Sequence, residues 1–207
     1  MQEFWDERYQ VEEYVYGKRP NTFFQSQLDT LKPGDVLLPG EGEGRNAVYA
    51  AEKGWNVSAF DVSKQGRYKA LRLAAERGVT IDYMLMPYQG FNQNESMYDV
   101  IGLFFTHQPP AMRRNFHRNL QNMVRPGGII LLEAFHKDQL KRETGGPKNI
   151  DFLFDETDLR EDFPMLEIVH LEVIERDLDE GPFHQGEAVV VQMIARAENG
   201  SKTFSFL

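Results

Sequence analysis

Cysteine is absent from the 207 residues, which excludes disulfide bonds, a thiolate nucleophile and thiolate metal ligands. Basic residues are in the minority: 23 Lys and Arg stand against 32 Asp and Glu, and the formal net charge is −9. Because a general nucleic-acid binder needs a basic surface for the phosphate backbone, we expect no nucleic-acid partner. The 5 histidines lack the spacing of a metal site, so we expect no bound metal.

Long apolar runs are also lacking. No run is long enough to span a bilayer, and no stretch resembles the apolar region of a signal peptide, so we expect a cytoplasmic protein with no membrane partner. Repeats and low-complexity tracts are absent, and 41% hydrophobic residues can supply one substantial core. The composition therefore predicts a single domain over residues 1–207, as a monomer or a homodimer that works on a small molecule.

A glycine-spaced loop is the main motif of the chain. The apolar residues 36–38 lead into Pro-Gly-Glu-Gly-Glu-Gly and then into a helical pattern. Gly40 and Gly42 leave room where the backbone turns tightly or approaches a ligand, and Gly44 allows the next helix to pack closely. A strand, a ligand-cradling turn and a helix N-terminus in this order indicate a nucleotide-type site.

The charge of this loop indicates which nucleotide-type ligand it can bind. Arg45 replaces the last glycine of the dinucleotide fingerprint, and no Gly-Lys-Ser/Thr sequence is present. Glu41 and Glu43 would repel a pyrophosphate, whereas the sulfonium and ammonium groups of S-adenosylmethionine suit them. Asp61 ends a second strand, residues 56–61, at the spacing expected for a carboxylate that binds ribose hydroxyls. The alternative is an ordinary turn whose glycines serve geometry only, with Asp61 as a helix N-cap.

Strand and helix patterns alternate along the chain, which predicts a parallel sheet with right-handed crossovers and ligands at the carboxyl ends of its strands. Residues 166–174 and 188–195 are joined by only about a dozen residues, which favours a closing hairpin. A Pro-Gly-Gly turn precedes a strand at residues 129–134. The remaining expected elements are helices at 46–53, 64–77, from 109 or 110, and 155–163, and strands at 80–85 and 98–105.

The helix that begins at Pro109 or Pro110 shows apolar residues every four positions. Met112, Phe116 and Leu120 predict one buried stripe. The three arginines of this helix are expected to face solvent or the rim of a pocket: Arg113, Arg114 and Arg118.

Four segments carry a family resemblance: GEGEGRNA, AFDVS, YDVI and VRPGGIILLE. In order and spacing they resemble the class I S-adenosylmethionine-dependent methyltransferases. The stretches WDERY, EYVYGKRPN and TGGP are similar to those of the small bacterial tellurite-resistance methyltransferases and, more distantly, the thiopurine S-methyltransferases. The resemblance implies an α/β, Rossmann-like fold with a seven-stranded, mostly parallel sheet, an antiparallel last strand and helices on both faces. It also implies S-adenosylmethionine as the cofactor.

Residues 1–21 are unusually aromatic and allow two interpretations. Phe4, Trp5, Arg8 and Tyr9 could share one face of a packed helix, or the segment could be a lid over the cofactor. The resemblance implies the lid. The candidate cofactor contacts from motifs and resemblance together are Trp5, Tyr9, Tyr16, Gly17, Gly40, Glu41, Gly42, Arg45, Asn46, Asp61, Val62, Ser63, Met86, Pro87, Phe104 and Phe105.

The third strand departs from the family pattern. Many relatives place a carboxylate after it for the adenine amino group, whereas this chain has Met84-Leu85-Met86-Pro87. The adenine would then be held by backbone atoms or by packing against Met86 and Tyr88. Met84 and Met86 could equally belong to the core.

Two histidines are candidate catalytic residues. His107 follows the fourth strand, next to Phe105 and Thr106, where relatives present residues to the transferring methyl group. His184 lies before the last strand, where the resemblance implies a histidine followed by arginine; here Gln185 follows. An oxyanion such as tellurite would lack that positive partner. Either histidine could instead be structural, His107 inside the fold and His184 in a surface turn.

The predicted function is methyl transfer to a small acceptor by in-line displacement, which requires alignment, exclusion of water and a base for a protonated nucleophile. The aromatic residues favour a largely apolar pocket and an acceptor with a thiol, selenol, amine or hydroxyl. The resemblance favours a thiol or chalcogen compound. Two alternatives stay open: a non-catalytic S-adenosylmethionine-binding protein, and an NAD-dependent oxidoreductase.

Overall fold

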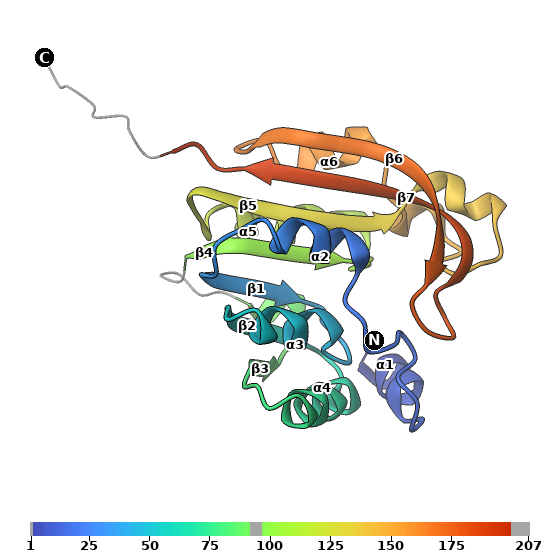
Figure 1. The fold of residues 1–207 in the computed structure, drawn as a ribbon. Helices are drawn as coiled ribbons and strands as arrows, with labels where there is room; N and C mark the ends of the chain where they lie inside the picture. The colour runs from blue at the N-terminus through green and yellow to red at the C-terminus, as the bar shows by residue number, and fades with distance from the viewer. Residues whose placement is uncertain (1, 92–96, 200–207) are drawn as a thin grey trace, which may run out of the picture.

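A computed structural model describes residues 2–91 and 97–199 of the chain; Met1, residues 92–96 and residues 200–207 lie outside the description. Its centre is a seven-stranded sheet in the order β3-β2-β1-β4-β5-β7-β6 (Figure 1). All neighbours pair in parallel except β7, which is antiparallel to β5 and β6. The expected sheet is confirmed. The strands are β1 Asp35–Pro39, β2 Asn56–Asp61, β3 Asp82–Leu85, β4 Tyr98–Phe104, β5 Val124–Phe135, β6 Glu167–Asp179 and β7 Gln185–Arg196.

Helices cover both faces of the sheet. Side chains alternate along β1, so that Val36 and Leu38 pack toward α2, α3 and α4, while Leu37 packs toward α5 and α6 (Figure 1). This alternation explains why an uninterrupted apolar run forms a strand buried on both sides. The helices are α1 Gln2–Tyr9, α2 Thr22–Leu28, α3 Arg45–Glu52, α4 Lys64–Glu76, α5 Pro110–Gln121 and α6 Glu156–Asp162, with short 3-10 turns η1 Tyr88–Gly90, η2 Lys137–Lys141 and η3 Ile150–Phe152.

The N-terminal helix α1 lies beside the start of α4 (Figure 1). The carboxylate of Asp6 accepts hydrogen bonds from the Ser63 hydroxyl at 2.6 Å and from the Gln65 backbone N–H at 3.2 Å. Ser63 itself caps α4 by accepting from the Gly66 N–H. Asp6 therefore ties α1 to the end of α4 that lies next to Asp61.

Two strand boundaries differ from the expectation. Residues 126–128 do not form a turn before β5; they lie inside it as an irregularity, where Tyr98 pairs with Val124 and Val100 with Ile129. β6 and β7 pair as far as Asp179 and Gln185, which leaves a loop of residues 180–184 instead of about a dozen residues. The second half of β6 is polar because one of its faces is exposed, so an apolar run marks only its first half.

The expectation for Arg113 is wrong. Its side chain is buried, with Nε 2.7 Å from Asp162 Oδ2 and Nη2 3.0 Å from Asp158 Oδ1. Arg118 is exposed, as expected. The expectation rested on the pattern of polar and apolar residues within α5 alone. The two carboxylates that neutralise Arg113 belong to α6, 45 and 49 residues further along the chain, so this pattern does not reveal them.

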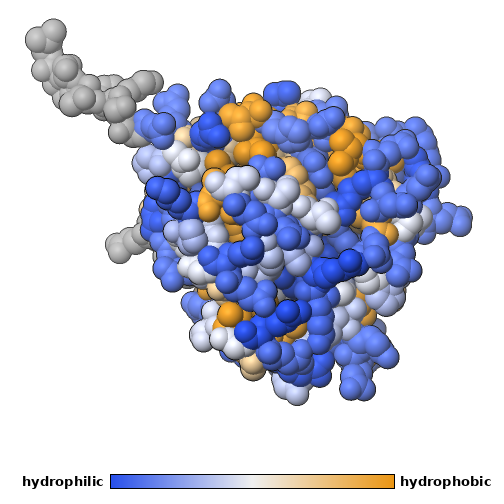
Figure 2. All heavy atoms as spheres, in the orientation of Figure 1, coloured by the Kyte–Doolittle hydropathy of each residue, from blue (hydrophilic) through white to orange (hydrophobic). Residues whose placement is uncertain are grey.

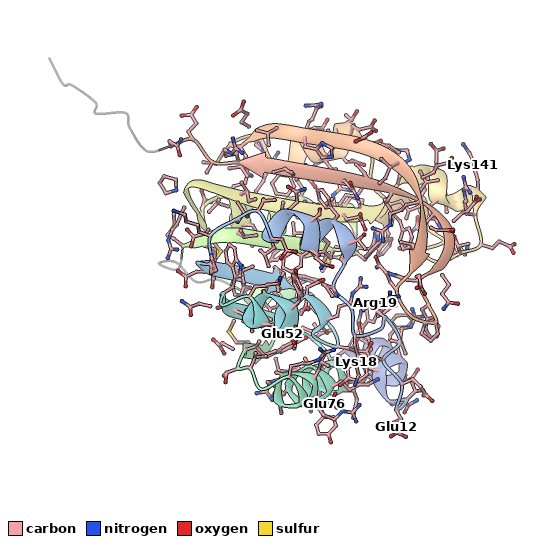
Figure 3. All side chains as sticks on the ribbon, in the orientation of Figure 1. Glu12, Lys18, Arg19, Glu52, Glu76 and Lys141 are labelled. Atoms are coloured by element: carbon pink, nitrogen blue, oxygen red, sulfur yellow. The ribbon has the colours of Figure 1, made fainter. Side chains whose placement is uncertain are left out.

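The face shown in Figure 2 is mostly hydrophilic. Charged side chains project from it, among them Lys18 and Glu76, which form an ion pair at 2.8 Å (Figure 3). Within residues 2–91 and 97–199, no helix is both long and apolar enough to cross a bilayer.

Candidate active site

A cavity of about 550 Å³ lies where β1, β2 and β4 end, between α1 and the β6–β7 hairpin. Its walls contain both candidate catalytic histidines and most of the candidate cofactor contacts. The sequence-predicted residues that line it are Trp5, Tyr9, Tyr16, Gly17, Gly40, Glu41, Arg45, Asn46, Asp61, Val62, Met86, Phe104, Phe105, His107 and His184.

Three predicted contacts lie outside this wall. Gly42 donates its backbone N–H to Asp61 at 3.1 Å. The Ser63 hydroxyl donates to Asp6 and accepts from the Gly66 N–H as the cap of α4. Pro87 precedes the turn η1 as its N-cap. All three lie within two residues of a residue that does line the cavity. Position in the sequence alone does not separate the residues that line a cavity from their neighbours.

The glycine loop is built for close approach. Gly40 has a φ of 64°, in the left-handed region, and a Cβ there would collide with the hydroxyl of Tyr88. Gly44 has a φ of 86°, and its Cβ would lie 2.5 Å from the Cβ of Ala70 on α4. The prediction that Gly44 allows close helix packing is confirmed.

The two glutamates of the loop have different roles. Glu41 Oε1 accepts from the backbone N–H groups of Asn46 at 2.7 Å and Ala47 at 2.8 Å, which caps α3. Burial raises the pKa of Glu41 to about 7. Glu43 Oε1 lies 2.6 Å from Lys69 Nζ and accepts from the Val15 N–H. Its charge is neutralised, so the argument from an acidic loop applies to Glu41 alone.

Asp61 is held in a fixed orientation at the end of β2. Its Oδ2 accepts from the Gly42 N–H at 3.1 Å and its Oδ1 from the Ser63 N–H at 2.8 Å. Burial raises the pKa of Asp61 to about 6, although these two hydrogen bonds lower it. The buried carboxylate keeps acceptor capacity toward the cavity, because each oxygen accepts more than one hydrogen bond.

The wall beyond β3 is apolar. Phe60, Met86 and Tyr88 line it, and the Met86 N–H donates to the backbone carbonyl of Asp61 at 2.9 Å. Met84 and Met86 both also pack against the core. Met86 therefore packs against the core and also lines the cavity, and its contact with adenine stays a prediction.

His107 lines the cavity and has one ring nitrogen without a hydrogen-bond partner among the described residues. Its Nδ1 lies 2.7 Å from the carbonyl oxygen of Phe152, and because a carbonyl only accepts, Nδ1 carries the proton. Nε2 is then unprotonated, and it is buried without a hydrogen-bond partner among the residues described. Burial lowers the pKa of His107 to about 4, so the ring is neutral at pH 7.

His184 is buried, so the expectation of a surface turn is wrong. Its ring contacts those of Tyr16 and Phe105, each with centroids 4.5 Å apart. Its Nδ1 lies 3.7 Å from Glu180 Oε2, and burial lowers its pKa despite this carboxylate. Gln185 is exposed and outside the cavity wall, so it provides no substitute for an arginine there.

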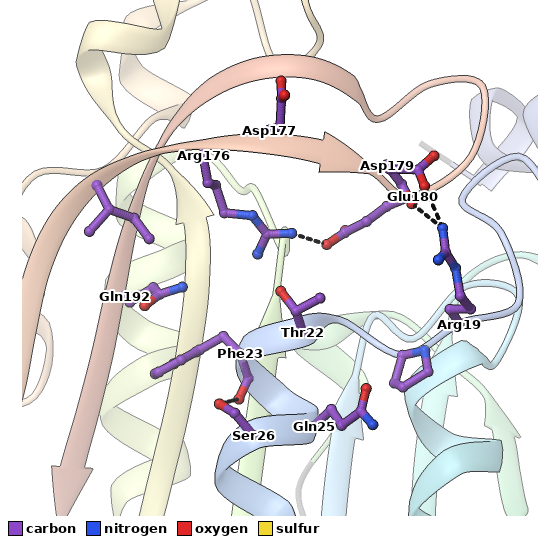
Figure 4. Close-up of a pocket in the computed structure, with 12 residues that line it drawn as sticks. Arg19, Thr22, Phe23, Gln25, Ser26, Arg176, Asp177, Asp179, Glu180 and Gln192 are labelled. Atoms are coloured by element: carbon purple, nitrogen blue, oxygen red, sulfur yellow. Dashed lines mark hydrogen bonds and ion pairs between the residues drawn. The ribbon is translucent and has the colours of Figure 1, made fainter.

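Glu180 joins the active site to a second hollow. Its Oε2 lies 2.8 Å from Arg45 Nη2, and its Oε1 pairs with Arg176, which also bonds the buried Glu133. Burial raises its pKa, but His184, Arg45 and Arg176 outweigh burial and hold it at about 2. Arg176 and Glu180 line the second hollow, of about 590 Å³, between α2 and the hairpin, where Arg19 pairs with Asp179 at the surface (Figure 4).

Phe105 is strained. Its φ of 56° lies in the left-handed region, which a bulky side chain rarely adopts, and its ring packs against Phe135 and His184. Sequence reasoning missed several cavity residues. Arg8 lies in the WDERY segment and could have been found there. Phe135 and Phe152 give no local signal in the sequence, because they reach the cavity only through the positions of the end of β5 and of the turn η3 in the fold.

Comparison with known proteins agrees with this geometry. Residues 36–128 match the family model described as "Methyltransferase domain". The 2-heptyl-1-hydroxyquinolin-4(1H)-one methyltransferase of Mycobacteroides abscessus is 25% identical over 173 residues, covering 78% of this chain and 74% of the relative. A ubiquinone biosynthesis O-methyltransferase of Rickettsia prowazekii is 26% identical over 125 residues, covering 60% of this chain. The chain spans about half of that relative, 47%.

Solved structures share the fold. TehB from Haemophilus influenzae superposes with a TM-score of 0.72 at 18% identity, over 95% of this chain and 67% of that one. The N-methyltransferase NodS from Bradyrhizobium japonicum, in complex with S-adenosylhomocysteine, superposes with a TM-score of 0.71 at 14% identity, over 97% and 98%.

The matched methyltransferase domain, the methyltransferase relatives and the shared fold support a class I S-adenosylmethionine-dependent methyltransferase, with S-adenosylmethionine as the cofactor. The relatives named above are methyltransferases, not NAD-dependent oxidoreductases. The residues present fit this cofactor. The buried carboxylate of Asp61 ends β2, and Gly40 allows the backbone to turn where a Cβ would collide with the Tyr88 hydroxyl.

Proposed function

We propose that this methyltransferase acts on a small, flat, largely apolar acceptor whose nucleophile carries a proton: a hydroxyl, thiol, selenol or amine. The observation that carries the proposal is the free Nε2 of His107, neutral and buried in the cavity wall. A neutral imidazole nitrogen accepts a proton or a hydrogen bond from such a nucleophile. The cofactor supplies an electrophilic methyl group on a sulfonium.

The glycine-loop half of the cavity is proposed to hold the cofactor. Asp61 would accept hydrogen bonds from the ribose hydroxyls. Met86 and Tyr88, with Phe60, form an apolar wall suited to the flat adenine ring. The loop end of the cavity, lined by Glu41 and Asn46, would take the polar amino-acid part.

The opposite half is proposed to hold the acceptor. Its walls are mostly aromatic rings around the two histidines, and such walls exclude water and align a flat molecule. His107 would take the proton of the nucleophile, and His184, against Phe105, would orient it. The rings are Tyr16, Phe105, Phe135, Phe152 and Phe183.

Two classes of acceptor are candidates: a ring-bound hydroxyl or thiol, and a chalcogen compound. The Mycobacteroides relative acts, by its name, on 2-heptyl-1-hydroxyquinolin-4(1H)-one, whose fused ring carries a hydroxyl, which supports an acceptor with a hydroxyl or thiol on a ring. The resemblance to tellurite-resistance enzymes favours a chalcogen compound. An unprotonated oxyanion gains nothing from His107, and Gln185 stands where the expected arginine would be, so we favour the protonated acceptor.

The test is an acceptor panel with S-adenosylhomocysteine release as the readout. The panel contains an aromatic hydroxyl, an aromatic thiol, tellurite and selenite, each with the wild type and with His107→Gln. We expect turnover of the hydroxyl or the thiol, and a large loss in His107→Gln. Turnover of the oxyanions alone, unaffected by His107→Gln, would contradict the proposed acceptor class. Cofactor binding without turnover of any acceptor would support a non-catalytic binding protein.

A further inference from the structure

One guanidinium in the cavity wall has no carboxylate partner. Arg8, on α1, donates from Nη1 to the hydroxyl of Tyr16 at 3.0 Å, and it forms no ion pair within residues 2–91 and 97–199. The other guanidinium of the wall, Arg45, is neutralised by Glu180 at 2.8 Å. The chain has 32 acidic residues, yet none of those described pairs with Arg8.

Aromatic rings hold this guanidinium. The Cζ atom of Arg8 lies 4.7 Å from the ring centroid of Phe4, 4.8 Å from that of Phe183 and 5.6 Å from that of Trp5. These rings attract the positive charge of the guanidinium through cation–π interactions. The N–H groups at its edge point in the plane, and only one of them is used by Tyr16. The free edge has the geometry that binds a carboxylate through two parallel hydrogen bonds.

The position of Arg8 favours the acceptor half of the cavity. Phe183 belongs to the β6–β7 hairpin, and Tyr16, the hydrogen-bond partner of Arg8, contacts His184 with ring centroids 4.5 Å apart. In the glycine loop, the Glu41 carboxylate accepts from backbone N–H groups in the first turn of α3 at 2.7 and 2.8 Å.

We propose that Arg8 forms a binding site for a planar carboxylate carried by the methyl acceptor. The inference rests on the proposed function, because it assumes that the aromatic half receives the acceptor. The acceptor would then be a flat molecule with a protonated nucleophile near His107 and an anionic group near α1. The same chemistry could come from the carboxylate of the cofactor, and the experiment separates the two sources.

The probes are benzoate and benzamide, which have similar shapes and differ in charge. Each is titrated by ligand-observed NMR into protein saturated with S-adenosylhomocysteine. The variants are Arg8→Gln and Arg8→Lys, and the matched control is Arg19→Gln, an exposed arginine that lines the other hollow. Each protein is also titrated with S-adenosylhomocysteine and with 5′-methylthioadenosine, which lacks the amino-acid part.

We expect benzoate to bind the wild type and Arg19→Gln more tightly than benzamide. Benzoate should bind about tenfold or more weakly to Arg8→Gln, with a smaller loss in Arg8→Lys, which keeps the charge but not the planar edge. S-adenosylhomocysteine should bind all four proteins equally.

Three results would overturn the inference. Equal binding of benzoate and benzamide, or benzoate binding that Arg8→Gln does not change, would remove the carboxylate site while leaving the cofactor site intact. Weaker S-adenosylhomocysteine binding by Arg8→Gln, with unchanged 5′-methylthioadenosine binding, would assign Arg8 to the cofactor carboxylate. No binding of S-adenosylhomocysteine by the wild type would instead contradict the proposed function itself.

Discussion

The Nδ1 atom of His107 lies 2.7 Å from the carbonyl oxygen of Phe152, on the turn η3. This hydrogen bond fixes the tautomer, so Nε2 is the ring nitrogen without a proton. It comes from the backbone of a segment 45 residues further along the chain, and it orients the ring without using any side chain of the acceptor half.

Replacement of His107 tests its role as a base. His107→Gln should lower kcat about a hundredfold or more for a protonated acceptor, in the range that general bases contribute. The affinity for S-adenosylhomocysteine should stay unchanged, because the proposed cofactor half lacks this residue. Steady-state kinetics and calorimetry measure the two quantities. An equal fall of both would assign His107 a structural role.

The depressed pKa of His107 predicts a pH dependence of stability. The folded group has a pKa of about 4 and the unfolded group the ordinary value of 6.5. Between these values the unfolded chain binds more protons, so the free energy of unfolding falls as the pH drops. From pH 7 to pH 5 the wild type should lose about 2 kcal/mol more than His107→Gln. Urea denaturation at both pH values measures this difference, in which the other titrating groups cancel. An equal loss in both proteins would contradict it.

Glu180 is predicted to be essential for the folded hairpin. Glu180→Gln removes the charge that faces Arg45 and Arg176, and leaves both cations partly uncompensated in a buried position. We expect a loss of about 3–5 kcal/mol in the free energy of unfolding. Asp179→Asn is the matched control, because its pair with Arg19 is 78% exposed on both sides and should contribute less than about 1 kcal/mol. Similar losses in both variants would show that the buried network is not what holds the hairpin.

A second pair of variants lies on α5. Arg113→Gln should destabilise the fold by about 3–5 kcal/mol, because it leaves Asp162 buried without its guanidinium. Arg118→Gln, on the exposed side of the same helix, should change the stability by less than about 0.5 kcal/mol. Chemical denaturation compares them, and a neutral Arg113→Gln would contradict the structural role of this ion pair.

The sequence predicts those features that depend on local geometry. The spacing from the glycine loop to Asp61 follows from the length of one βαβ unit, so Gly40, Asp61 and the parallel sheet could be anticipated. The N-caps of α2 and α6 are also local, since the side chains of Asn21 and Asp155 each accept from a backbone N–H three residues on.

The features that the sequence does not predict depend on partners far along the chain. Arg113 resembles a solvated arginine until α6 brings Asp162 to it. Glu43 resembles part of an acidic ligand loop until Lys69 neutralises it. The strain at Phe105 has no sequence signal at all, because it arises where packing against Phe135 and His184 fixes the end of β4.

The most direct test of the central claim is calorimetric titration with S-adenosylhomocysteine. The proteins are the wild type, Asp61→Ala and the control Asp82→Ala, whose carboxylate is exposed on the neighbouring strand. We predict micromolar binding by the wild type and by Asp82→Ala, and at least tenfold weaker binding by Asp61→Ala, about 1.4 kcal/mol. No binding by the wild type, or equal binding by Asp61→Ala, would contradict the assignment of the cofactor to this cavity.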